Sequence, residues 1–218
     1  MIEQLFQQHC NLIDSYLKQD KSLSSHHKAL LITLLENKIN ETNYYYNINS
    51  WNYRNNYRYD PYSRETLKFA LLTEFLIDNF NCNIFHDLGS GLGTKLKIVN
   101  DLYPHIICTG FEINEYMLKL SKRLLSNNYN CAVINSDLRN AKFSADLIYL
   151  FNPIDQTREL IDIIYSQFTK YQILISNNIY SFNHFDDKEC TKIYPFYIYS
   201  KNENIHKTLE IFNLGDKM

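Results

Sequence analysis

The sequence lacks a charge excess, a long apolar run and a leader-like N-terminus. Its 22 Lys and Arg residues face 24 Asp and Glu residues, so the net charge of −2 gives no reason to expect a polyanion as the main partner. Its longest apolar stretches, such as 30–35, fall far short of the ~18 residues that a membrane span requires. The first residues show no basic segment followed by an apolar core and a cleavage site. We therefore expect a cytoplasmic protein without a membrane partner.

Closely spaced cysteines are also missing. The five cysteines are odd in number and contain no Cys-x-x-Cys pair; they are Cys10, Cys82, Cys108, Cys131 and Cys190. Structural zinc sites and redox motifs need such close spacing. The histidines show no ligand spacing either. We expect reduced, mostly buried thiols and no metal site.

The chain has enough apolar residues for one core. It contains 218 residues, of which 45% are hydrophobic and 21% are charged. These values are typical of a globular protein and argue against a disordered chain. A chain of this length buries roughly 70% of its unfolded surface, which favours a single globular domain.

The first sixty residues differ in character from the rest. Apolar residues recur at helical spacing in two stretches before residue 40, which predicts two helices. The segment 44–62 then carries seven tyrosines among asparagines and ends near a turn-like Asp-Pro pair. We interpret residues 1–60 as an N-terminal helical cap with a tyrosine-rich lid or linker, and residues 61–218 as the main domain.

From about residue 63 onward, helical and strand patterns alternate. Helices are predicted at 63–78, 92–102, 114–125 and 160–168. Strands are predicted at 84–88, 106–111, 131–135, 147–151 and 173–176, with 193–199 and 208–213 as the last two candidates. Such alternation is typical of a parallel α/β sheet. The short link between the last two runs favours an antiparallel closing hairpin.

Three of the five glycines stand together, at Gly89, Gly91 and Gly93, directly after the first of these strands. Glycine permits positive φ and a close approach of the backbone to a ligand. Open α/β sheets bind ligands at the carboxyl ends of their strands. The spacing Asp-x-Gly-x-Gly-x-Gly differs from the Gly-x-Gly-x-x-Gly of dinucleotide sites, and Asp87 would meet a pyrophosphate with negative charge. The loop therefore favours a cationic ligand.

This acidic triple-glycine loop resembles the first motif of the class I S-adenosylmethionine-dependent methyltransferases, and the resemblance covers about residues 59–214. It implies a Rossmann-like α/β fold with a seven-stranded, mostly parallel sheet, and S-adenosyl-L-methionine as the cofactor. In that family the loop backbone approaches the methionine part of the cofactor, and the acid equivalent to Asp87 lies near its amino group. The loop residues that would make this approach are Gly89, Ser90, Gly91 and Gly93.

Two further acids match the family's order of cofactor contacts. Glu112 ends the second strand, 19 residues after Gly93, where the family binds both ribose hydroxyls, and Ile113 follows it as a further cofactor contact. Asp137 follows the third strand, where the family accepts a hydrogen bond from the adenine amino group, and the Leu138 amide is available to the ring. A lone acid at a strand end is commonly only a helix cap. Three in order at successive strand ends predict a cofactor site.

The fourth strand ends in Phe151-Asn152-Pro153, next to the expected methyl group. Methyl transfer is an in-line displacement, so much of the catalysis is alignment of the acceptor. In amine methyltransferases with an Asn-Pro-Pro-aromatic motif here, the Asn side chain accepts hydrogen bonds from the target nitrogen, although Ile154 and Asp155 depart from that motif. We assign Asn152 as the candidate catalytic residue and as a cofactor contact. A plain turn that ends a strand is the structural alternative.

A closer local resemblance is to bacterial class I methyltransferases that have a Phe-Asn-Pro strand end and an upstream Tyr-x-Pro segment. These are similar to the non-SET histone-lysine methyltransferases, and Tyr59 would begin the upstream segment and contact the cofactor. The resemblance implies an amine acceptor, with protein lysine as the leading class. The alternatives are a small-molecule methyltransferase, a catalytically silent S-adenosylmethionine-binding module, and an RNA methyltransferase that uses Arg54 and Arg58. A protein or small-molecule acceptor is favoured over a nucleic acid.

Overall fold

The computed structural model describes residues 64–91, 93–150, 158–176, 185–193 and 196–215. The chain divides into two compact units, residues 1–71 and 72–218. The expected helical cap and tyrosine-rich lid lie outside the described residues, as do Tyr59 and Asn152.

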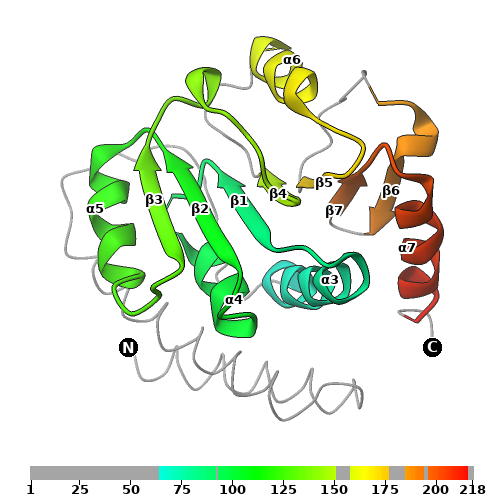
Figure 1. Ribbon diagram of the computed structural model, residues 1–218, viewed down its shortest axis with the longest axis horizontal. Coiled ribbons are helices and arrows are strands. Elements are labelled where there is room, and N and C mark those ends of the chain that lie inside the picture. Colours follow the sequence, from blue (N-terminus) through cyan, green and yellow to red (C-terminus); the bar gives the residue numbers. More distant parts are fainter. Residues whose placement is uncertain (1–63, 92, 151–157, 177–184, 194–195, 216–218) are drawn as a thin grey trace. The chain divides into compact units, whose positions relative to one another are not determined.

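A seven-stranded sheet forms the centre of the second unit (Figure 1). Its strands are β1 (Ile84–Leu88), β2 (Ile107–Glu112), β3 (Cys131–Asn135), β4 (Leu147–Leu150), β5 (Ile173–Ser176), β6 (Cys190–Ile193) and β7 (Phe196–Tyr199). Their order in space is β3-β2-β1-β4-β5-β7-β6. The first five strands are parallel, whereas β7 pairs antiparallel with β5 and β6. The prediction of a mostly parallel sheet with antiparallel closing strands is confirmed.

Helices connect the parallel strands, because parallel neighbours need a crossover. The described helices are α3 (Arg64–Phe80), α4 (Thr94–Leu102), α5 (Glu115–Leu124), α6 (Arg158–Gln167) and α7 (Glu203–Gly215), with short 3-10 turns η1 (Leu138–Asn140) and η2 (Asp187–Glu189). The crossovers from β1 to β2 and from β2 to β3 are α4 and α5, as predicted. Among these helices, none combines the length and apolar character that a membrane crossing needs.

The last part of the chain corrects the placement of the closing hairpin. The segment 208–213, expected as a strand, belongs to α7, while the expected strand 193–199 is divided between the end of β6 and β7. Ile205 and Leu209 explain the helix, because both are buried and lie four residues apart on one helical face. The antiparallel hairpin therefore consists of β6 and β7, and α7 packs against β6 and η2.

The core lies on both faces of the central strands. Both β4 and β5 are buried throughout, as their uninterrupted apolar runs predict. On one face, Phe111 packs edge-on against Phe143, and the cluster continues through Leu160 and Ile164 of α6. On the other face, fully buried Leu96 anchors α4 beside β2. This packing on two faces fixes the ends of β1 and β2, where the glycine loop begins.

Candidate functional site

Parallel pairing brings the predicted acids to one edge of the sheet. Asp87 is level with Gly110 of β2 and with Tyr149 of β4. Glu112 lies two residues beyond Gly110 and is level with Asn135 of β3. Side chains alternate along a strand, so Asp87, Gly110 and Glu112 share the face that α4 covers. Two acids that are far apart in sequence are thus neighbours beside the glycine loop.

The glycine loop is a sharp turn between β1 and α4. Gly89, Gly91 and Gly93 have φ values of 80°, 52° and 79°, a region that other residues rarely adopt. The amides of Gly89 and Ser90 donate to the Phe111 carbonyl oxygen at 2.9 and 3.0 Å, and the Gly93 amide donates to the Ser90 carbonyl at 2.8 Å. These hydrogen bonds hold the loop to β2. The positive φ values explain why glycine occupies these three positions.

Gly91 and Gly110 differ in what surrounds the missing side chain. A Cβ atom on Gly91 would meet nothing within 4 Å, so the loop backbone borders open space there. A Cβ atom on Gly110 would lie 2.5 Å from Ser90 Oγ and 2.7 Å from Leu96 Cδ1. Gly110 is thus required for the loop to pack on β2, a role that the glycine-loop motif does not predict. Its position inside a strand of a glycine-poor chain was the signal that could have revealed it.

Glu112 ties the loop to the start of α5. Its carboxylate accepts hydrogen bonds from the Gly91 amide at 2.8 Å and from the Asn114 amide at 2.7 Å. The side chain is buried at the end of β2. A carboxylate has about four lone-pair sites, so two remain for other donors such as a pair of hydroxyl groups. Glu112 therefore both fixes the loop and keeps acceptor capacity.

Asp87 is the buried acid at the start of the glycine loop. It is 3% exposed, and its carboxylate accepts no hydrogen bond from the described residues. Burial raises the pKa of Asp87 to about 7; the Lys95 ammonium opposes this rise and the Glu112 carboxylate adds to it. Buried polar groups nearly always have partners, because an unpaired one destabilises the fold. The arrangement suits a ligand that brings a cationic donor.

Two hydroxyl groups near the loop are also buried without a hydrogen-bond partner among the described residues. They belong to Ser90 and to Thr94, the first residue of α4. The Ser90 hydroxyl faces the backbone of Gly110, so it lies toward β2. Together with Asp87, these groups leave unused hydrogen-bonding capacity around the loop.

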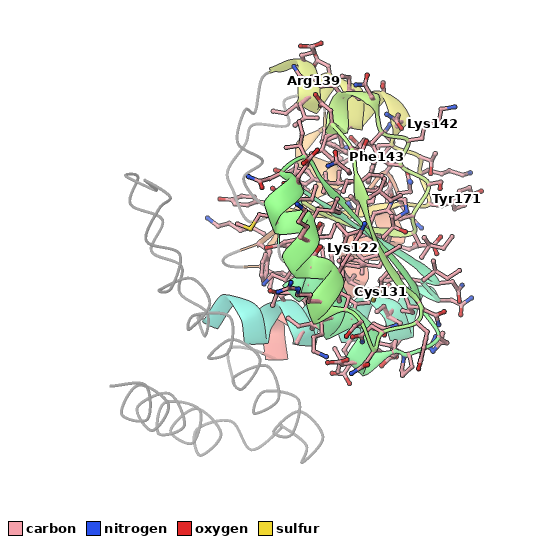
Figure 2. The ribbon with its side chains drawn as sticks, turned by 90° about the vertical axis from the view of Figure 1, so that its left-hand side faces the viewer. Lys122, Cys131, Arg139, Lys142, Phe143 and Tyr171 are labelled. Atoms are coloured by element: carbon pink, nitrogen blue, oxygen red, sulfur yellow. The ribbon has the colours of Figure 1, made fainter. Side chains whose placement is uncertain are left out.

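The third predicted acid has a different environment. Asp137 caps η1, and its carboxylate accepts hydrogen bonds from the Arg139 amide at 2.9 Å and from Arg139 Nε at 3.0 Å, with Nη2 completing the ion pair. These contacts lower the pKa of Asp137. Figure 2 shows Arg139 beyond the carboxyl end of β3, at the opposite end of that strand from Cys131. Asp137 is thus already paired within the protein.

The residues that follow Glu112 and Asp137 offer one apolar and one polar contact. Ile113 is 57% exposed, which is unusual for a large apolar side chain beside a buried acid. The Leu138 amide, as the first of η1, has no acceptor within that short helix. Both groups lie at the same edge of the sheet as the loop.

The structure brings most of the predicted site to the carboxyl ends of β1, β2 and β3. The residues at this edge are Asp87, Gly89, Ser90, Gly91, Gly93, Glu112, Ile113, Asp137 and Leu138. Tyr59 and Asn152 lie outside the described residues, so their roles stay predictions. Lys95 and Arg139 act on Asp87 and Asp137 but were missed, because their sequence neighbourhood does not reveal whether either acid is buried.

The comparisons with known proteins identify the fold. No family model and no curated protein matches the sequence. A putative caffeoyl-CoA O-methyltransferase from Staphylococcus aureus has a TM-score of 0.55 at 15% identity, over 89% of this chain and 100% of that chain. At this identity the likeness shows the fold alone, which is the Rossmann-like methyltransferase fold. The predicted fold class is confirmed.

Two other solved structures cover smaller parts of the chain. An O-methyltransferase from Brevibacillus brevis in complex with S-adenosyl-L-homocysteine has a TM-score of 0.42 at 22% identity, over 54% of this chain and 44% of that chain. The structure named StiE O-MT has a TM-score of 0.43 at 20% identity, over 52% of this chain and 45% of that chain. The match thus spans less than half the length of either protein.

Proposed function

We propose that this chain binds S-adenosyl-L-methionine at the glycine loop and transfers its methyl group to an amine, with protein lysine as the leading acceptor. One observation carries the proposal: the buried Asp87 carboxylate, without a hydrogen bond from the described residues, lies beside a loop that borders open space at Gly91. The amino-acid part of the cofactor carries an ammonium group. Such a group is the charged donor that this carboxylate lacks.

Other described residues suit the remaining parts of the cofactor. Glu112 has acceptor capacity for two ribose hydroxyls in addition to its two backbone donors. The exposed Ile113 provides an apolar contact for a flat base, and the Leu138 amide provides a donor to a ring nitrogen. A dinucleotide suits the site less well, because Asp87 and Glu112 would repel its pyrophosphate.

When bound, S-adenosyl-L-methionine supplies an electrophilic methyl group on a sulfonium centre. The protein's task is then to align the acceptor lone pair with the methyl group and to exclude water. We assign the alignment to Asn152, whose amide oxygen would accept a hydrogen bond from the acceptor nitrogen. An apolar channel around that nitrogen would favour its neutral form, the form that can attack.

The choice of an amine rests on the sequence of the strand end and not on the neighbouring folds. Phe151-Asn152-Pro153 follows β4, which lies next to β1 in the sheet, so Asn152 follows the strand beside Asp87. The Tyr59-Asp60-Pro61 segment supports the same family resemblance. A protein or a small molecule that carries an amine is therefore the proposed partner.

Calorimetric titration of the full chain tests the cofactor. We expect S-adenosylmethionine and S-adenosylhomocysteine to bind and NAD, the control ligand, not to bind. Binding of NAD alone, or of none of the three, would contradict the proposed cofactor.

Labelled methyl transfer tests the acceptor. Lysate is incubated with the protein and methyl-labelled cofactor. Separate portions are then treated with ribonuclease, with protease or with mild base. An N-methyl amine survives base, whereas a methyl ester releases methanol. Label that is lost with ribonuclease or with base would contradict a protein or small-molecule amine. Asn152→Ala should reduce methyl transfer much more than it reduces cofactor affinity, and equal losses in both would favour a structural role.

A further inference from the structure

Lys95 lies on the helix that covers the face of the sheet at the candidate cofactor site. It lies in the first turn of α4, two residues after Gly93, the last glycine of the loop. Its ammonium is 5.5 Å from the ring centroid of Tyr149. Tyr149 is level with Asp87 on the neighbouring strand, so the two side chains share a face. Lys95 therefore approaches the face on which the Asp87 carboxylate is buried.

Two acids are buried on this face, Asp87 and Glu112. Glu112 accepts two backbone amide hydrogen bonds, from Gly91 and Asn114. Asp87 accepts none from the described residues and lies within electrostatic reach of Glu112. Burial and the negative charge of the Glu112 carboxylate both raise the pKa of Asp87, to about 7. A nearby cation is needed to keep Asp87 in its carboxylate form.

The strands beside Asp87 provide no such cation. On β2, the Cys108 thiol is influenced by Asp87 and is itself neutral or negative. On β4, Tyr149 contributes a phenol with the same two charge states. Among the described residues, the cation that acts on Asp87 is Lys95.

The other titratable groups around β1 and α3 are directed elsewhere. His86, the residue before Asp87, lies on the opposite face. Its ring packs edge-on against the Phe111 ring, with 5.2 Å between the ring centroids. Glu74 and Asp78 on α3 act on Tyr103, whose hydroxyl donates to Asp78 at 2.6 Å. Neither set supplies positive charge to the buried acid.

We infer that Lys95 is a positioning residue, which keeps Asp87 ionised so that the site can bind the ammonium group of its ligand. This inference rests on the proposed function, because it assumes a ligand of that kind. Affinity for such a ligand depends on the Asp87 carboxylate. The affinity therefore falls as the pH drops through the midpoint of the Asp87 titration. Without Lys95 this midpoint rises, and the affinity is lost at a higher pH.

The test follows ligand affinity across the pH range in which Asp87 ionises. The full chain is titrated with S-adenosylhomocysteine, which carries the ammonium group, from about pH 5.5 to about pH 8. A second ligand, 5′-methylthioadenosine, has the nucleoside but not the amino-acid part. The variants are Lys95→Met, which removes the charge, and Lys95→Arg, which keeps it. Lys97→Met is the matched control, because Lys97 lies on the same helix and pairs with Asp101 at 2.9 Å.

The two roles of Lys95 predict different results. If it maintains the Asp87 charge, Lys95→Met raises the pH midpoint of S-adenosylhomocysteine binding by about one unit. Lys95→Arg and Lys97→Met keep the original midpoint, and 5′-methylthioadenosine binds all variants alike. An unchanged midpoint in Lys95→Met, or an equal loss for both ligands at every pH, would overturn the inference and leave the proposed function intact. If the unmodified chain binds neither ligand, the proposed function itself fails, and the inference with it.

Discussion

Asp87 and Asp137 are the same residue type at neighbouring strand ends, yet their surroundings act in opposite directions. Asp87 is buried without a hydrogen bond from the described residues, and burial raises its pKa to about 7. Asp137 is partly exposed and paired with Arg139, which lowers its pKa. Desolvation controls the first acid, and a paired cation controls the second.

This contrast indicates which of the two acids a bound ligand stabilises more. A group that lacks a partner in the protein recovers its desolvation cost when a ligand supplies one. A group that is already paired exchanges one partner for another, so its net gain is small. On this reasoning Asp87 dominates ligand affinity, and Asp137 adds a smaller contribution at the adenine end.

The largest effect is expected in the pH dependence of folding. An acid with a raised pKa in the folded state binds its proton more tightly when folded. Its contribution to the free energy of unfolding is therefore fully present below about pH 4 and is lost as the pH rises to about 7. The change attributable to Asp87 is at most roughly 4 kcal/mol. Asp137 acts in the opposite sense, because its stabilisation is present above about pH 4 and is lost in acid.

Urea unfolding at several pH values separates the two acids. Asp87→Asn should flatten the decline between about pH 4 and pH 7 and should make the ligand-free protein more stable above neutral pH. Asp137→Asn should leave that decline unchanged. A decline of the same size in Asp87→Asn would show that another group causes it.

The next effect concerns ligand affinity. Asp87→Asn removes a charge-assisted bond to an ammonium group and should weaken S-adenosylhomocysteine binding about a hundredfold, or roughly 2 to 3 kcal/mol. Asp137→Asn should weaken it by no more than several fold. Calorimetric titration at about pH 8, where Asp87 is ionised, measures both. Equal losses in the two variants would contradict the ranking.

Glu112 provides an intermediate test at the strand between the two. Glu112→Gln places an amide NH2 group where one oxygen now accepts from the Gly91 or the Asn114 amide. One of those donors then loses its acceptor, so we expect about a tenfold loss of affinity, roughly 1.4 kcal/mol. The control is Glu115→Gln, because Glu115 is an exposed acid in the first turn of α5. Unchanged affinity in Glu112→Gln would remove Glu112 from the site.

The smallest effect is expected at Arg139. Solvent screens the exposed Arg139–Asp137 ion pair, so Arg139→Ala should change S-adenosylhomocysteine affinity by less than about fivefold. The same variant should raise the pKa of Asp137, because the guanidinium that lowers it is gone. Carbon-13 NMR titration of the aspartate carboxyl groups measures this change. A large loss of affinity would mean that Arg139 contacts the ligand directly.

Much of the fold could be predicted from local sequence patterns. The strands β1, β3 and β5 have the predicted boundaries, because each is a short apolar run that is set off by turn residues or by the glycine loop. The segment 208–213 was misassigned, since a short apolar run is ambiguous between strand and helix until its burial pattern is known. The same ambiguity led to the wrong choice of segments for the closing hairpin.

The location of the site follows from the order of motifs along the chain, because a glycine loop after the first strand and acids after the next two must meet at one edge of a parallel sheet. The differences between these acids arise only when the chain folds. Asp87 is buried without a hydrogen bond to its carboxylate from the described residues and is acted on by the Lys95 ammonium, whereas Glu112 accepts a hydrogen bond from the loop backbone at Gly91. A pKa depends on desolvation and on charges brought close by folding, and neither is encoded in the residues next to an acid.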